Sequence, residues 1–186
     1  MLKKLTQIIT LTICVGFGAS AYAALLDAEL GYPQIFTDSV DVKYQANKDI
    51  FTIYATNDST YTLYNDDESE GIPLSADSYE FIVNVDSNGQ LTEEGELTIK
   101  SDGVSLLDAI VTEFGWEFSS TNDALFNAIF TITDADPILN FGNDKVGLMV
   151  ASFDNLFFKD WDSGFKSKSG IVYTDPAPIP EPITFA

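Results

Sequence analysis

The chain has no histidine and no arginine, and its one cysteine is Cys14. All nine basic residues are therefore lysines; they stand against 29 acidic residues, and the formal net charge is −20. The absence of histidine excludes Ser-His-Asp and Cys-His catalytic sites and removes the usual ligands of zinc, copper and haem. The acidic excess argues against nucleic acid as a partner, because the phosphates would meet a strongly negative field. The same excess is compatible with solubility and with loose capture of divalent cations.

The first residues show the three-part pattern of a secretory signal peptide. Two lysines precede an apolar run at residues 5–18, and small residues follow it. We therefore expect export by the Sec machinery and removal of residues 1–23 by signal peptidase, with cleavage between Ala23 and Ala24. A retained membrane anchor is one alternative, although the run contains polar residues and is shorter than the about 20 apolar residues that a span needs. A lipoprotein anchor on Cys14 is another, although an isoleucine stands where a small residue normally precedes such a cysteine.

Removal of the signal peptide would change the composition in two ways. The formal net charge would go from −20 to −22, because two lysines leave and no acidic residue does. The exported form would also contain no cysteine and hence no disulfide. An exported protein without disulfides is more typical of bacteria than of small eukaryotic secreted domains.

Apolar and polar residues alternate with the two-residue period of β-strands along most of the remaining chain. The clearest hairpin joins residues 79–85 to residues 97–99 through an Asn-Gly pair at residues 88–89, which tolerates the positive φ of tight turns. Another turn is expected at residues 46–49. We therefore predict an all-β fold, a single antiparallel β-sandwich or barrel-like domain over residues 24–174, with at most one or two short helices.

Two segments leave alternatives open. Leu107, Val111 and Phe114 fit a helical period, whereas β-branched and aromatic residues dominate the segment and favour a strand. Further along, Trp161 and Phe165 lie among lysines and glycines. They are either exposed on a binding face or they close the end of the core.

One acidic stretch resembles a calcium-binding loop in its spacing. Asp66, Glu68 and Glu70 stand at the first, third and fifth positions, Gly71 follows at the sixth, and Asp77 stands at the twelfth. Two glutamates replace shorter acids, an aspartate replaces the bidentate glutamate, and no helices flank the loop. The alternatives are a calcium site on the four acidic residues and a solvated acidic turn. No other cofactor is expected.

Paired carboxylates are the one catalytic device that the composition leaves open, as in glycoside hydrolases. Aspartate and glutamate are so abundant that no pair is singled out. We therefore expect no catalytic residues and a non-enzymatic protein.

The C-terminal residues resemble the start of a PEP-CTERM sorting signal. Pro180, Glu181 and Pro182 match the signature triplet, and residues 183–186 are similar to the beginning of its apolar segment. The hairpin at residues 81–103 is also similar to a recurrent strand, Asn-Gly turn and strand of that family. In the family, a membrane-spanning helix and an arginine-rich end follow the triplet, and neither is present here.

The resemblance implies processing by an exosortase in the inner membrane, association with exopolysaccharide and biofilm, and no known activity. Residues 175–186 are then expected to be a proline-rich linker and a truncated sorting signal. The resulting hypothesis is an exported, non-enzymatic surface or extracellular-matrix protein, with transient anchoring in the inner membrane. The alternatives are a glycan- or calcium-binding β module and a small carboxylate-dependent glycoside hydrolase.

Overall fold

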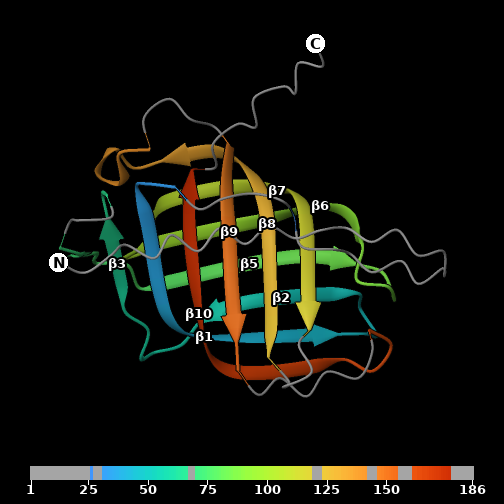
Figure 1. Cartoon of the computed structure of the whole chain (residues 1–186). Coiled ribbons are helices and arrows are strands. Elements are labelled where there is room, and N and C mark those ends of the chain that lie inside the picture. The colour runs from blue at the N-terminus through green and yellow to red at the C-terminus, as the bar shows by residue number, and fades with distance from the viewer. Residues whose placement is uncertain are drawn as a thin grey trace, which may run out of the picture.

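A computed structural model describes residues 26, 31–66, 70–118, 123–141, 146–154 and 161–176 (Figure 1). Most of these residues lie in ten strands, and the prediction of an all-β fold is confirmed. The strands are β1 (Gln34–Gln45), β2 (Ile50–Ala55), β3 (Tyr61–Tyr64), β4 (Ile72–Pro73), β5 (Ser78–Val85), β6 (Leu91–Ser101), β7 (Val104–Phe118), β8 (Ala124–Ala135), β9 (Val146–Phe153) and β10 (Phe165–Pro176).

Helical structure is confined, in the part of the chain described, to one 3-10 turn, η1 (Pro137–Leu139). Its first turn is capped by Asp136, whose side chain accepts a hydrogen bond from the backbone N–H of Ile138. None of these residues belongs to a helix that is long and apolar enough to cross a membrane.

Pairing between the first and the last strand closes the sheet into a barrel. Eight antiparallel strands follow one another in the order β1-β2-β5-β6-β7-β8-β9-β10, and β10 pairs with β1 over Ile35 to Tyr44. Strands β3 and β4 form a small extension, with β3 paired to the first residues of β1. Of the two predicted architectures, sandwich and barrel, the structure therefore has the barrel.

Bulges bend the two strands that close the barrel. The register of β1 against β10 shifts on both sides of Val40, and Ser39 and Ser169 have φ values of 53° and 60°. A β-bulge bends its strand and increases its twist, which a closed barrel of few strands requires. In Figure 1, β8, β9 and β10 accordingly form one layer that runs across β2, β5 and β6 behind it.

A bulge also explains why β7 resembles a helix in sequence. Leu107, Ala109 and Val111 face the interior, and the register against β8 shifts between Val111 and Glu113. The next inward residue is therefore Phe114 rather than residue 113. One extra residue in a two-residue period places buried side chains three and four apart, which is also the spacing of a helix face.

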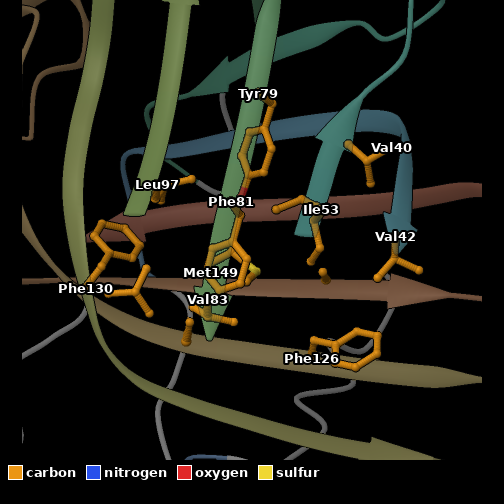
Figure 2. Close-up of a cluster of buried hydrophobic side chains, with 14 of the residues drawn as sticks. Val40, Val42, Ile53, Tyr79, Phe81, Val83, Leu97, Phe126, Phe130 and Met149 are labelled. Carbon is orange, nitrogen blue, oxygen red and sulfur yellow. The ribbon is translucent and has the colours of Figure 1, made fainter. Parts of the chain in front are cut away.

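The interior of the barrel is filled by aromatic and branched side chains. Figure 2 shows Phe81 of β5 and Phe126, Phe130 and Met149 of β8 and β9 pointing into the space between the two layers. All four side chains are fully buried. Phe51 lies at the centre of the aromatic group, with its ring 4.7 Å from that of Phe126 and 6.2 Å from that of Phe81. Such contacts contribute beyond the area that they bury.

Trp161 and Phe165 belong to this core and are not exposed on a binding face. Trp161 is 3% exposed and Phe165 is 9% exposed. The Trp161 ring lies 4.9 Å from that of Tyr44 and 5.3 Å from that of Trp116. Of the two alternatives that the sequence left open, the structure selects closure of the barrel end.

The predicted Asn-Gly turn joins β5 to β6. The Asp86 carboxylate accepts hydrogen bonds from the backbone N–H groups of Asn88 and Gln90, at 2.8 and 2.9 Å. Slight burial raises the pKa of Asp86, but these hydrogen bonds outweigh it and hold the pKa below its usual value. Gly89 follows with a φ of 74°, which glycine adopts without strain.

Strand β10 continues two residues beyond the predicted boundary of the domain at residue 174. Asp175 is paired with Leu148 and Pro176 with Gly147. The remaining residues of the predicted tail, including the triplet Pro180 to Pro182, lie outside the described residues, as do residues 1–23 and the expected cleavage site.

Candidate functional site

The four residues of the predicted calcium loop are only partly described. Asp66 and Glu70 flank residues 67–69, which lie outside the described part of the chain and include Glu68. The Asp77 carboxylate accepts a hydrogen bond of 2.6 Å from the backbone N–H of Asp102, so it already supports the turn between β6 and β7. Among the residues described, no three acidic side chains are grouped so that they could hold a metal ion. Calcium binding therefore stays a prediction.

A groove lies where the end of β1 meets the beginning of β10. It encloses about 560 Å³ and is open to solvent. Its walls are residues 43–47, from β1 and the turn after it, and residues 162–166, from the loop that enters β10. These two segments are distant in sequence and are joined by the pairing that closes the barrel.

Two lysines stand side by side at this groove. Lys43 and Lys166 are directly opposite each other on β1 and β10, and both side chains are exposed. Cβ atoms of directly opposite residues are about 4.5–5.5 Å apart, and like charges in such a pair are destabilising. Neither ammonium group forms an ion pair with a described residue.

The lysines that the structure describes are concentrated on the same two segments. Lys48 lies in the turn after β1, and Lys168 follows Lys166 on β10, whereas Lys100 on β6 is the one described lysine elsewhere. Asp49 and Asp162 lie on the same two segments, so these lysines stand among carboxylates and partly offset their charge. Clustered cations of this kind attract anionic ligands over a few ångströms.

Two aromatic residues stand next to the lysine pair along the same strands, on the opposite face of the sheet. Tyr44 and Phe165 are also paired across β1 and β10, and their rings are 5.5 Å apart. Burial, followed by the negative charges of Asp49, Asp162 and Asp86, raises the pKa of Tyr44, so the phenol stays protonated. Tyr44 and Phe165 therefore face the interior of the barrel, whereas Lys43 and Lys166 face the solvent.

The other side chains along the groove are short and polar. Gln45, Asn47 and Ser163 offer amide and hydroxyl groups, and Asp162 is the one carboxylate among the lining residues. A glycosidase needs two carboxyl groups, about 5 to 10 Å apart, on either side of the bond that it breaks. This groove presents one, so its lining suits recognition rather than hydrolysis.

A buried carboxyl group lies away from the groove, near the other end of β10. Asp175 is fully buried, one carboxylate oxygen accepts a hydrogen bond from the backbone N–H of Gly31, and the other has no hydrogen-bond partner among the described residues. Burial raises the pKa of Asp175 to about 7, against the opposing effect of the Gly31 hydrogen bond. Leu26, which precedes Gly31 in the sequence, is held by the Asn127 side chain through two hydrogen bonds of 3.1 and 3.2 Å.

Neither the lysine pair nor Asp175 was identified from the sequence. The pairing of Lys43 with Lys166 depends on the register between the first and last strands, for which the local pattern carries no signal. Asp175 follows a run of alternating residues and directly precedes prolines, so the sequence predicts that it belongs to the proline-rich linker. Comparison with protein-family models, with curated proteins and with solved structures gives no match for this chain.

Proposed function

We propose that this protein is an exported, non-enzymatic surface or extracellular-matrix protein whose β-barrel is a structural and binding module. The observation that carries this proposal is the way the barrel is filled. Large side chains such as Phe51, Phe81, Phe126, Phe130 and Phe153 are fully buried in its interior, where ligand-binding barrels of eight strands hold a small molecule. A filled barrel presents its outer surface and its ends to partners.

The groove supports this proposal over a carboxylate-dependent hydrolase. It brings one carboxylate, Asp162, together with two lysines, and such a set can bind a ligand without cleaving it. As the alternative function, the polar lining of the groove supports a glycan-binding module, whereas a calcium-binding module would rest on the acidic loop at residues 66–77.

Export rests on the N-terminal pattern, and sorting rests on the C-terminal triplet. In this proposal signal peptidase cleaves after Ala23, and an exosortase-type system then acts on Pro180, Glu181 and Pro182, leaving the barrel at the cell surface or in an exopolysaccharide matrix. The absence of cysteine after cleavage agrees with this route, because folding outside the cytoplasm then needs no disulfide formation.

The export step is tested by expressing the full chain in a Gram-negative host and measuring the intact mass in each cell fraction. We expect a periplasmic or extracellular product that begins at Ala24. Ala23→Phe places a bulky residue before the cleavage site and should leave the precursor uncleaved, whereas Ser20→Thr should be processed normally. A cytoplasmic protein that keeps residues 1–23 would contradict the proposal.

A further inference from the structure

The geometry points to a binding site for an anionic sugar in the groove between β1 and β10, with Lys43 and Lys166 holding the acidic group. This inference deepens the binding role proposed above and takes its biological setting from it. The shared chemistry is a sugar ring that carries a carboxylate or a sulfate ester.

The charge selects an anion. Two ammonium groups on directly opposite residues repel each other, and neither forms an ion pair with a described residue, although the Asp162 carboxylate lines the same groove. One anionic group placed between them accepts a charge-assisted hydrogen bond from each, which removes the repulsion and adds two strong contacts. A metal cation at the same place would meet two positive charges.

The neighbouring side chains select a ligand that is rich in hydroxyl groups. Gln45 and Asn47 each present an amide that both donates and accepts, Ser163 presents a hydroxyl, and Asp162 accepts hydrogen bonds. The groove has a volume of about 560 Å³ and is wide open to solvent, so a ligand bound there stays partly hydrated. A sugar acid fits both the charge and the hydrogen-bonding groups, since each ring carries several hydroxyls beside its acidic group.

The backbone argues against an extended acidic peptide. At the level of Lys43, β1 is paired on one edge with Thr52 of β2 and on the other with Lys166 of β10. Both edges are therefore occupied, and β1 has no free N–H or C=O groups to which a peptide strand could add.

The test is isothermal titration of the purified full chain with a galacturonic acid hexamer, a sulfated galactan oligosaccharide and neutral maltohexaose. Measurements at about 0.01 M and about 0.15 M ionic strength compare screening lengths of about 30 and about 8 Å. We expect one or both acidic sugars to bind, maltohexaose to bind at least about tenfold more weakly, and added salt to weaken the binding of the acidic sugars. Tighter binding of the galacturonic acid hexamer would identify a carboxylate as the acidic group of the ligand, and tighter binding of the sulfated galactan would identify a sulfate.

The double variant Lys43→Gln with Lys166→Gln is expected to raise the dissociation constant at least about tenfold, because it removes both charge-assisted contacts. Both side chains are exposed, so the melting temperature should not fall. The matched control is Lys100→Gln, which removes the same charge from β6, outside the groove, and should change the dissociation constant by less than about twofold.

Three results would overturn the inference. In the first, the double variant binds the acidic sugars as well as the unmodified chain. In the second, Lys100→Gln weakens binding to the same extent, which would mean that only net charge matters. In the third, sedimentation shows that the chain self-associates through the groove and that the double variant is monomeric. The binding measurement uses purified protein, so a failure here is distinct from a failure of export.

Discussion

The buried carboxyl group of Asp175 allows a prediction whose size follows from the structure. Burial raises the pKa of Asp175 to about 7, against an ordinary value of 3.8. The folded chain therefore keeps a proton on this group at pH values where the unfolded chain has released it. Between about pH 4 and pH 7, stability should fall as the pH rises, and above pH 7 the loss should be complete. The difference between the two pKa values corresponds to on the order of 4 kcal/mol.

Asp175→Asn removes the titration and keeps the shape of the side chain. At pH 4 the variant should be about as stable as the unmodified chain, because both side chains are then neutral. At pH 8 it should be more stable, by up to about 4 kcal/mol, since an ionised group no longer has to be buried. The amide oxygen can still accept the hydrogen bond from the Gly31 N–H.

The assay is urea denaturation from pH 4 to pH 8, followed by the fluorescence of the buried Trp116 and Trp161. The informative quantity is the difference in unfolding free energy between variant and parent, because the titrations of the other acidic residues cancel in it. Asp134→Asn, at an exposed position of β8, is the control for the loss of one surface carboxylate. If Asp175→Asn instead destabilises the chain at pH 8, the ionised carboxylate is the form that the Gly31 contact stabilises, and the reasoning is refuted.

Two further perturbations test the turn and the acidic loop. Gly89→Ala should destabilise the chain by about 2 kcal/mol or more, since φ is 74° and an added Cβ would overlap the indole rings of Trp116 and Trp161. The control is Gly103→Ala, which measures the backbone cost alone because φ is 76° and the space around the residue is open. If thermal melts show the same loss of stability for both variants, the added Cβ at residue 89 does not collide with the indole rings. If the acidic loop binds calcium, millimolar calcium should raise the melting temperature and Asp66→Asn with Glu70→Gln should abolish the rise. If the melting curve is the same with and without calcium, the loop does not bind calcium and the solvated acidic turn is the remaining interpretation.

Local patterns in the sequence were sufficient to predict the strands and their turns. The alternation of residues 79–85 and the Asn-Gly pair after them specify a hairpin within a few residues, because strand period and turn conformation are properties of neighbouring residues. The composition likewise excluded histidine-dependent chemistry without any knowledge of the fold. The acidic character of the surface is a matter of residue counts alone.

The same local reasoning was insufficient where a residue's role depends on a distant strand. The bulge in β7 made Leu107, Val111 and Phe114 appear helical, and only the register against β8 shows that they share the inward face of a strand. The sequence is compatible with Trp161 on the surface or in the core, and the contact of its ring with that of Trp116 shows that it belongs to the core. In both cases the deciding contact is with a residue on a distant segment, and the sequence alone does not show that the two segments meet.

By itself, then, the sequence determined the class of fold, the hairpin turns and the kinds of chemistry that the chain lacks. The tertiary structure decided that the sheet closes into a barrel, that Lys43 and Lys166 stand opposite each other, and that Asp175 is buried. The physical reason is the range over which each preference acts. Backbone propensity and side-chain alternation operate over a few residues, whereas closure, register and burial depend on which strands meet across the whole chain.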